Sequence, residues 1–437
     1  MASTYLTRTF QSGGNTAKWT FSAWIKKCAI TNNDDTIFSR YQSADYYTTV
    51  AFGSDRLFFT QRHAGTNVGY LETDQHFRDV NGWYHFVFVW DSGNVTANNR
   101  MRIYVNGSEI TSFSTRTNPS QDLGSTWNTA HPMEIGRHNS GNYFNGYMSH
   151  VHFCDGYAYS PTDFGETDSN GVWSIKTSPS VSYGTTGFLI LKDGNTITDQ
   201  SSNSNAWTLS GGTLTDMQDC PDNVFATMNP LDNYEQGSTF TIGNNKVEWN
   251  TDNKTNYANF AINKGKYYWE MKFANNTGGD YGMIGISVED YRQPDDYPGH
   301  DSTGWSYYAS SGNKYNNGGG SYGDSWTVND IIGVAFDADT RTLWFSKNGV
   351  WQNSATISEI AAGTTTNAAW TGMGSAGDWF IPCMSGYDGN KAEFNFGNGY
   401  FSTTQITDEG TNASGIGKFE YDVPNNFTAL CTKGLNN

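Results

Sequence analysis

The stretch at residues 329–351, N-D-I-I-G-V-A-F-D-A-D-T-R-T-L-W-F-S-K-N-G-V-W, decides the fold of this chain. It predicts two apolar strands, Ile331 to Phe336 and Thr342 to Ser346, joined by a turn at residues 337–340. A second turn follows at Asn348-Gly349, because both residues accept the positive φ that a type I′ turn needs. The stretch therefore predicts an antiparallel hairpin that serves as framework for a sheet.

The same pattern occurs earlier, at Arg102 to Ile110, where R-I-Y-V-N-G-S-E-I again places Asn-Gly between two strand-forming runs. Such runs recur along the 437-residue chain at intervals of about 8 to 12 residues, a spacing typical of antiparallel sandwiches. We therefore predict an all-β protein with two antiparallel jelly-roll or β-sandwich domains, at residues 1–182 and 223–437. Residues 183–222 are rich in Ser, Gly, Asn, Asp and Thr. We predict that they form a connector that contains one short strand.

Composition supports sheets and limits the partners. Charged residues make up 16% of the chain and aromatic residues 15%, which excludes a disordered chain and disfavours long surface helices. The 26 Lys and Arg against 43 Asp and Glu give a net charge of −17. Such a surface repels phosphate, so we expect neither nucleic acid nor an anionic membrane as partner.

The apolar runs are too short for membrane insertion, since a spanning helix needs roughly 18 apolar residues. The first ten residues also lack the basic start and apolar core of a signal peptide, so we expect a soluble protein made in a cytoplasm. The 5 cysteines are far apart and without a C-x-x-C, which predicts buried free thiols rather than disulfides or a zinc site.

One strand, Gly82 to Asp91, is apolar on both alternating sets of side chains. Such a strand belongs at the centre of a sheet that is covered on both faces. His85 lies within it and is predicted to be a core residue. His150 and His152 alternate on a later strand and can face a metal together, but the sequence offers no third ligand.

The first half resembles a known family. The pieces W-T-F-S-A-W-I-K, W-Y-H-F-V-F-V-W-D, R-I-Y-V-N-G, I-G-R-H-N-S-G-N-Y-F-N-G-Y-M-S-H-V-H-F and S-P-T-D-F stand in the order of a LamG-like domain of the concanavalin A-like type, over Thr16 to Glu166. The segment Asp193 to Thr208, D-G-N-T-I-T-D-Q-S-S-N-S-N-A-W-T, resembles a motif that recurs beside such domains. Its oxygens are either Ca²⁺ ligands or part of a solvated turn; we expect no other cofactor.

The second half resembles a SPRY domain over Phe240 to Phe401. The pieces K-G-K-Y-Y-W-E, I-G-I, G-W-S-Y, K-Y-N-N-G, the stretch at residues 329–351, F-I-P and F-N-F-G follow the order of that family. Together with the N-x-F-A-T-M-N-P-L entry and the Y-D-V-P…A-L-C-T ending, the whole chain resembles virion proteins of tailed phages, especially marine ones. That resemblance implies a fibre, knob or decoration protein located in the virion, which binds other virion proteins and a host surface glycan or protein, as a homo-oligomer of the trimeric kind.

Catalytic motifs give little support for an enzyme. Glycan hydrolases on this fold need paired carboxylates at alternate strand positions, and the nearest approaches are Glu72 with Asp74 and Glu166 with Asp168, each without a third acid. We therefore expect a non-enzymatic binding protein. A glycan-cleaving enzyme with a dispersed acid pair and an intracellular SPRY-type adaptor remain alternatives.

Binding is expected in the polar and aromatic loops at the ends of the sandwiches, since rigid sheets hold such loops in place. Tyr and Trp stack on sugar rings or anchor a protein partner, and the alternative is that they fill the cores. The candidate ligand-binding residues are Arg40, Tyr41, Tyr46, Tyr47, Arg62, His63, Tyr143, Tyr291, Arg292, Trp305, Tyr307 and Tyr315.

Overall fold

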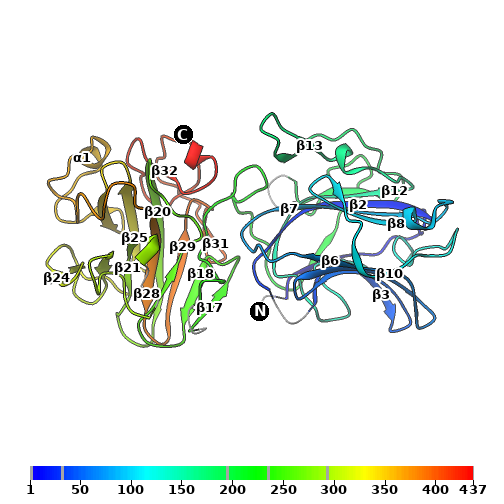
Figure 1. The fold of residues 1–437 in the computed structure, drawn as a ribbon, viewed down its shortest axis with the longest axis horizontal. Helices are drawn as coiled ribbons and strands as arrows, with labels where there is room; N and C mark the ends of the chain where they lie inside the picture. The colour runs from blue at the N-terminus through cyan, green and yellow to red at the C-terminus, as the bar shows by residue number, and fades with distance from the viewer. Residues whose placement is uncertain (1–2, 31–33, 193–195, 234–236, 292–294, 437) are drawn as a thin grey trace. The chain divides into compact units, whose positions relative to one another are not determined.

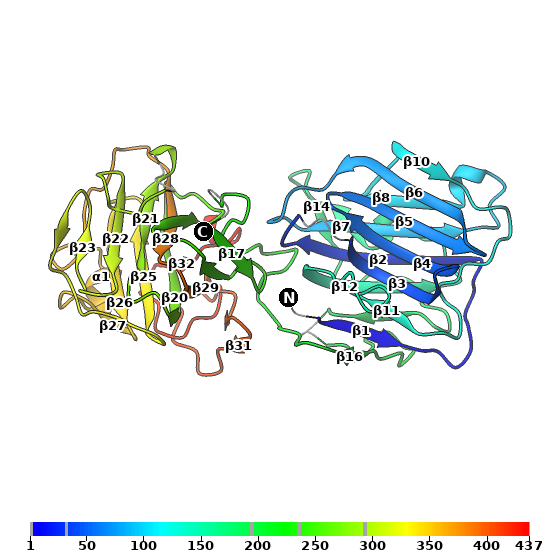
Figure 2. The same ribbon diagram turned by 90° about the horizontal axis from the view of Figure 1, so that it is seen from below.

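The computed structural model describes residues 3–30, 34–192, 196–233, 237–291 and 295–436. The chain forms two compact units, residues 1–216 and 217–437, and each is built from antiparallel sheets (Figures 1 and 2). The predicted all-β class is therefore confirmed. Within the described residues, no helix has the length and apolar character needed to cross a membrane.

The first unit is a two-layer sandwich (Figure 1). One sheet has eight strands in the order β10-β6-β5-β4-β3-β11-β1-β16, and the other has six in the order β15-β12-β2-β7-β8-β9. The strands of the unit are β1 Tyr5–Arg8, β2 Lys18–Lys27, β3 Asp34–Ser43, β4 Tyr46–Gly53, β5 Arg56–His63, β6 Thr66–His76, β7 Tyr84–Asp91, β8 Met101–Val105, β9 Ser108–Glu109, β10 Phe113–Thr117, β11 Met133–Ile135, β12 Gly146–Asp155, β13 Gly165–Thr167, β14 Trp173–Ile175, β15 Phe188–Ile190 and β16 Thr208–Ser210. Short 3₁₀ turns lie at Ala97–Asn99 and Pro161–Asp163.

Aromatic side chains fill the space between these two sheets. Phe38 lies 4.2 Å from Phe21 and 4.7 Å from Trp127, measured between ring centroids. Trp19, on the same strand as Phe21, is fully buried and contacts Phe59 at 5.7 Å. Large apolar rings in close contact dominate the energy of such a core, so the high aromatic content of the first half is largely explained by packing.

The six-stranded sheet is covered on its outer face as well. The segment that carries β13 and β14 lies over this face (Figure 1). Val87 and Val89 of β7 pack against Phe164 of that segment. Every residue of β7 after Tyr84 is buried, which confirms the predicted doubly covered central strand. His85 is a core residue as predicted: its Nδ1 accepts from Trp173 Nε1 at 3.1 Å, and burial lowers its pKa to about 3.

Residues 183–210 belong to the first unit, which differs from the expected connector. β15 pairs with β12 and β16 pairs with β1, so each sheet gains an edge strand from this segment. Asp199 fixes the chain between them, because its carboxylate accepts from the backbone N–H groups of Leu189 at 2.9 Å and Asn205 at 2.6 Å. The composition of this polar segment does not reveal that its two strands pair with β12 and β1, which are distant in the sequence.

The second unit is also a two-layer sandwich. One sheet has the order β17-β18-β29-β20-β25-β26-β27, with β32 parallel to β20, and the other has the order β19-β28-β21-β22-β23-β24. Its elements are β17 Ser238–Thr241, β18 Lys246–Trp249, β19 Lys254–Tyr257, β20 Lys266–Asn276, β21 Met283–Val288, β22 Gly304–Tyr308, β23 Lys314–Tyr315, β24 Gly319–Gly320, β25 Ile331–Asp337, β26 Thr342–Lys347, β27 Val350–Trp351, α1 Ile357–Ala361, β28 Phe380–Gly386, β29 Asn390–Asn395, β30 Tyr400–Phe401, β31 Thr404–Gln405 and β32 Thr428–Ala429, with 3₁₀ turns at Glu289–Tyr291 and Gly434–Asn436.

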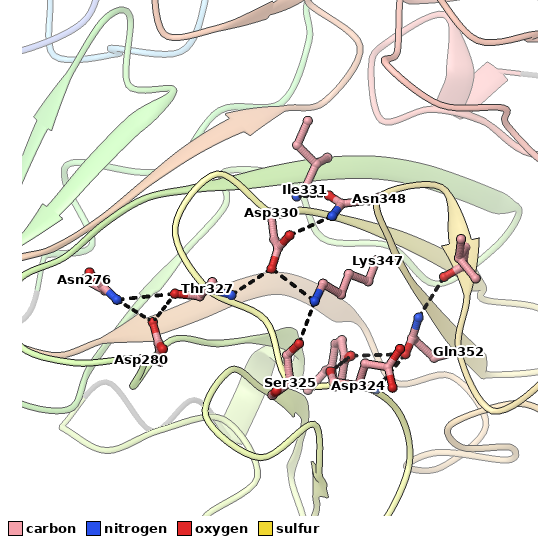
Figure 3. Close-up of polar contacts among 12 residues, drawn as sticks. Asn276, Asp280, Asp324, Ser325, Thr327, Asp330, Ile331, Lys347, Asn348 and Gln352 are labelled. Carbon is pink, nitrogen blue, oxygen red and sulfur yellow. Dashed lines mark hydrogen bonds and ion pairs between the residues drawn. The ribbon is translucent and has the colours of Figure 1, made fainter.

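The predicted hairpin is confirmed as β25 and β26, and Asn348 and Gly349 have the positive φ angles, 49° and 79°, expected of the turn after it. Asp330 fastens this turn to the preceding loop (Figure 3). Its carboxylate accepts from Asn348 Nδ2 at 2.6 Å and from the Thr327 N–H at 2.9 Å, and it forms an ion pair with Lys347 at 3.2 Å. The stretch is therefore framework rather than a ligand site.

Asp330→Asn is expected to lower the free energy of unfolding of the second unit by about 1–2 kcal/mol at pH 7, since one oxygen acceptor and the charge are lost. Burial raises the pKa of Asp330, but hydrogen bonds from Thr327, Asn348 and Lys347 outweigh it and hold the pKa below its ordinary value. A lowered pKa contributes stability that is present above the unfolded-state pKa and is lost as pH falls through the folded-state pKa. Urea unfolding at pH 7 and pH 3 should therefore show the difference between variant and wild type shrinking in acid.

The C-terminal extension covers the outer face of the larger sheet of the second unit. Phe419 and Phe427 pack there against Tyr268 and Trp344. Glu270, on β20, is fully buried and receives the backbone N–H groups of Glu420 and Tyr421, each at 2.9 Å. This carboxyl group ties the extension to the sheet.

Candidate functional site

The outer face of the eight-stranded sheet in the first unit carries a cluster of rings. Strands β3, β4 and β5 lie side by side in this sheet (Figure 2). The register places Tyr41 of β3 beside Tyr47 of β4, and Tyr47 beside Arg62 of β5. The Tyr41 and Tyr47 rings lie 6.3 Å apart at 27° to each other. His138, from the segment after β11, meets both rings nearly edge-on at 5.2 Å. We call Tyr41, Tyr47 and His138 the ring cluster.

His138 is held in one orientation. Its Nδ1 lies 2.7 Å from Thr49 Oγ1, on the same face of β4 as Tyr47. Burial lowers the pKa of His138 to about 4, so the imidazole is neutral at pH 7. A neutral ring among tyrosines presents apolar surface together with hydrogen-bonding atoms, which is the combination that recognises a sugar ring.

Tyr70 and Glu72 of β6 extend this face beyond the ring cluster. Tyr70 Oη donates to Glu72 Oε2 at 3.1 Å, and Arg56 lies 3.8 Å from the same carboxyl group. Burial, with Glu72 next to it, raises the pKa of Tyr70 to about 12, so the phenol keeps its proton. The face therefore offers a carboxylate and phenolic groups to a polar ligand.

Arg40 behaves differently from its neighbour Tyr41, because alternate strand residues point to opposite faces. It lies on the inner face beside Thr48 and is only 2% exposed. Gln61 and His63 of β5 share this inner region, with 3.0 Å between Gln61 Nε2 and His63 Nε2. Arg40 was expected at the surface and is corrected to a buried position.

The remaining candidates of the first unit are not part of the ring cluster. Tyr46 is 40% exposed and its ring lies 6.0 Å from that of His63. Tyr143 is half-buried and packs 6.2 Å from Tyr5. The structure thus brings Tyr41, Tyr47 and Arg62 together on one face, while Tyr46 and His63 stand at the strand ends.

Two candidates of the second unit are wrong, because they are core residues. Trp305 is 4% exposed and Tyr307 is fully buried. The register pairs them with Ile286 and Ile284 of β21, so alternation places both rings on the inner face of the sheet. The W-S-Y spacing already contained this information, since residues two apart share a face.

Tyr315 belongs to a second ring cluster, formed with Tyr297, Tyr308 and His300. Tyr315 lies 5.7 Å from Tyr308 and 6.0 Å from Tyr297, both nearly perpendicular, and His300 lies 5.4 Å from Tyr297. Tyr297, Tyr308 and His300 are not among the candidates predicted from sequence. Arg292 lies outside the described residues, as does the side chain of Tyr291.

The acidic and metal candidates have structural partners. Asp74 accepts from Ser112 at 2.5 Å, Glu166 lies 3.9 Å from Lys176, and Asp168 receives the backbone N–H groups of residues 170 and 172. His152 is buried and its Nδ1 lies 2.9 Å from Tyr183 Oη. A bulge between Ser149 and His152 breaks the alternation that was to place His150 on the same face.

No group of three or more His, Cys, Asp or Glu among the residues that the structure describes can hold a metal ion. In the segment resembling a Ca²⁺ motif, residues 193–195 are outside the described residues. In the described part of it, Asp199 accepts from backbone N–H groups and Asn205 Oδ1 accepts from Arg8 at 2.8 Å.

Family models match each unit. Residues 2–163 match the Laminin_G_3 model, described as the concanavalin A-like lectin/glucanases superfamily, and residues 266–399 match the SPRY domain model. The chain carries a concanavalin A-like domain followed by a SPRY domain. The two resemblances seen in the sequence are therefore confirmed, within the first and second units respectively.

Curated relatives share only part of this architecture. The chain is 30% identical over 88 residues to a Ran-binding proteins 9/10 homolog of Drosophila melanogaster, over 20% of this chain and 9% of that protein. It is 30% identical over 130 residues to the ATP-dependent RNA helicase DDX1 of Xenopus laevis, over 28% of this chain and 16% of that protein. The chain thus spans less than a fifth of either relative.

Among solved structures, the SPRY domain of human HERC1 is similar to this chain, with 21% identity and a TM-score of 0.29. The match covers 38% of this chain and 96% of that one.

Proposed function

We propose that this protein is a non-enzymatic binding protein of a tailed-phage particle, a tail fibre, knob or decoration used in host attachment, and that its concanavalin A-like domain binds a host surface glycan. The observation that supports it most is the ring cluster, where Tyr41 and Tyr47 stand side by side on an outer sheet face and the neutral His138 contacts both. Parallel rings of this kind stack on sugar rings at low cost in side-chain entropy.

The polar groups around the ring cluster support a sugar ligand. Arg62 is in register with Tyr47, and Tyr70 and Glu72 carry donors and an acceptor onto the same face. Sugars require both apolar stacking surface and hydrogen bonds to hydroxyl groups, because their faces are apolar and their edges polar. The net charge of −17 favours solubility and opposes nucleic acid as ligand.

In the same proposal, the SPRY domain contacts neighbouring proteins of the particle, and the chain is a homo-oligomer, which the resemblance implies to be a trimer. Its second ring cluster, around Tyr315, supplies aromatic side chains of the type enriched in protein interfaces. Mass spectrometry of purified particles tests the location directly. If the protein is missing from particles that are otherwise complete, the virion assignment is wrong.

The double variant Tyr41→Ala/Tyr47→Ala is expected to weaken glycan binding by about 10- to 100-fold, since each stacked ring contributes about 0.5–1.5 kcal/mol. A glycan array identifies the ligand, and calorimetry on the full chain then measures the loss. The matched control is Tyr157→Ala/Tyr159→Ala. It removes another stacked ring pair, 5.5 Å apart, from the same unit, in the segment that covers the outer face of the six-stranded sheet. Equal loss in both variants would contradict the assignment.

The alternative is a glycan-cleaving enzyme, because Glu72 and Asp74 are two residues apart on β6 and lie on the same face of the sheet. The release of reducing ends from the bound polysaccharide, abolished by Glu72→Gln, would overturn the non-enzymatic part of the proposal. Unchanged polysaccharide after prolonged incubation with stoichiometric protein supports it.

A further inference from the structure

Arg40 is a buried cation without an acidic partner. Its side chain is 2% exposed, and Nη2 donates to Gln42 Oε1 at 2.9 Å. Nε and Nη1 have no hydrogen-bond partner in the described part of the chain, and no carboxylate there forms an ion pair with this guanidinium. Burial accordingly lowers the pKa of Arg40. Buried charges in proteins are normally paired, because an unpaired one costs several kcal/mol.

The comparison with other arginines shows that this is specific to Arg40. Buried nitrogens without a partner are confined to Nε in Arg8, Arg102 and Arg341, as far as the described residues extend. Arg8 uses both of its Nη atoms, one on Asn205 and one on the Ala206 carbonyl. Arg40 alone in this set has a buried terminal nitrogen without a partner.

The polar side chains that share the inner face with Arg40 form hydrogen bonds with one another. Gln61 Oε1 accepts from Thr48 Oγ1 at 2.7 Å and from Ser125 Oγ at 3.0 Å, so its Nε2 is the end that faces His63. Thr48 Oγ1 also lies 2.6 Å from Thr126 Oγ1. These groups satisfy one another, which leaves the free N–H groups of Arg40 for an outside ligand.

Arg40 lies next to the exposed end of the β3–β4 hairpin. Gln42 and Tyr46 are exposed and flank the turn at Ala44 and Asp45, while the half-buried His63 lies beneath the Tyr46 ring. Gln42 is a neutral acceptor on a short exposed segment, so an oxyanion that enters here can replace its Oε1 on Arg40. Charge-assisted hydrogen bonds of guanidinium to an oxyanion are about twice as strong as neutral ones.

We propose that Arg40 is the anion-binding residue of a subsite for an acidic sugar, whose carboxylate displaces Gln42 while its ring lies against Tyr46. The sugar part rests on the proposed glycan-binding function. A net charge of −17, with Asp45 in the turn itself, repels densely charged polymers. The subsite therefore suits one carboxylate on an otherwise neutral glycan.

The experiment uses the full chain with glucuronate, with glucose as its neutral counterpart and with inorganic sulfate. Arg40→Met removes the charge at similar volume, and Arg78→Met is the matched control, since that arginine is 65% exposed at the surface. Calorimetry is expected to show glucuronate binding that falls at least about tenfold in Arg40→Met and stays within about twofold in the control.

Two further measurements are the pKa of His63 and the thermal stability of the variants. Burial and the charge of Arg40 lower the pKa of His63, so glucuronate is expected to raise that pKa in ¹³C-histidine NMR while glucose leaves it unchanged. Arg40→Met should be at least as thermostable as wild type, because an unpaired buried charge is removed. A marked loss of stability in Arg40→Met would show a structural role and overturn the proposal.

The remaining outcomes separate this proposal from the broader one. Sulfate that binds as well as glucuronate, through Arg40, overturns the acidic-sugar assignment and leaves an oxyanion site. Glycan binding that is lost in Tyr41→Ala/Tyr47→Ala but unchanged in Arg40→Met overturns this subsite and keeps the proposed function. No effect of any oxyanion on His63 overturns it outright.

Discussion

Glu270→Gln is expected to lower the free energy of unfolding of the SPRY-containing unit by about 2–3 kcal/mol at pH 6. Glu270 is fully buried, and its two oxygens accept four hydrogen bonds. Oε1 accepts from Tyr268 Oη at 3.0 Å and the Tyr421 N–H, and Oε2 accepts from Asn395 Nδ2 at 3.1 Å and the Glu420 N–H. A glutamine amide turns one oxygen into a donor, so at least one backbone N–H loses its acceptor in either orientation.

A protonated Glu270 does not suffer this loss. Its O–H can donate to the Tyr268 hydroxyl, the one partner that can also accept, while both backbone N–H groups keep an oxygen. Burial raises the pKa of Glu270 to about 7 although four hydrogen bonds oppose the shift. A raised pKa contributes stability that is present below the unfolded-state pKa and is lost as pH rises through the folded-state pKa. Wild type should therefore lose stability between about pH 5 and pH 8, and Glu270→Gln should lack that slope.

Guanidinium unfolding, followed by fluorescence of the buried tryptophans, measures both effects. Glu248→Gln is the matched control, because Glu248 forms an exposed pair with Lys391 at 2.8 Å on the same sheet. Exposed pairs contribute about 0–1 kcal/mol, so the control should stay near wild type. A pH slope that persists in Glu270→Gln would assign the titration to another group.

Asp155→Ala is expected to cost about 3–5 kcal/mol in the concanavalin A-like unit, the largest effect that we predict there. Oδ1 of Asp155 accepts from the Asn15 N–H and from Asn128 Nδ2, both at 2.7 Å. Oδ2 accepts from the N–H groups of Thr185 and Thr186 at 3.0 and 3.2 Å. Alanine removes the acceptor of three backbone N–H groups and one of the two acceptors of Asn128 Nδ2, which keeps the Asn15 carbonyl, and it releases three chain segments from β12.

The matched control is Asp74→Ala, since that exposed carboxylate on β6 accepts only from Ser112 among the contacts of the described residues. Its loss should change the free energy of unfolding by less than about 1 kcal/mol. Thermal unfolding of the full chain should show a lower first-unit transition in Asp155→Ala and an unchanged second-unit transition. Equal shifts in both variants would contradict the role given to Asp155.

Local patterns predicted the framework well. Asn348-Gly349 specified its turn because few residue pairs tolerate two positive φ angles, and the doubly apolar strand around His85 required two covering layers. Both held in the structure. β6, Thr66–His76, was not predicted as a strand, because its glycine and polar side chains weaken the alternation that marks one.

The candidate sites were harder to predict, because they depend on which face of a strand each residue occupies. Arg40 and Tyr41 are neighbours in sequence and lie on opposite faces, and a bulge between Tyr41 and Ser43 shifts the register beyond them. His138 joins the ring cluster from a segment 89 residues beyond Thr49, its hydrogen-bond partner. Long-range pairing of this kind leaves no local trace in sequence.

The covering segment over the six-stranded sheet has a consequence for local opening. β2 and β7 lie between two packed layers, so their amide hydrogens should exchange with solvent only when the whole unit unfolds. The edge strands β9 and β10, with exposed side chains, should exchange through smaller fluctuations. The covering segment itself is partly exposed, with two of the three residues of β13 at the surface. Amide hydrogens of the covering segment should therefore exchange for deuterium before those of β2 and β7 in the sheet beneath it.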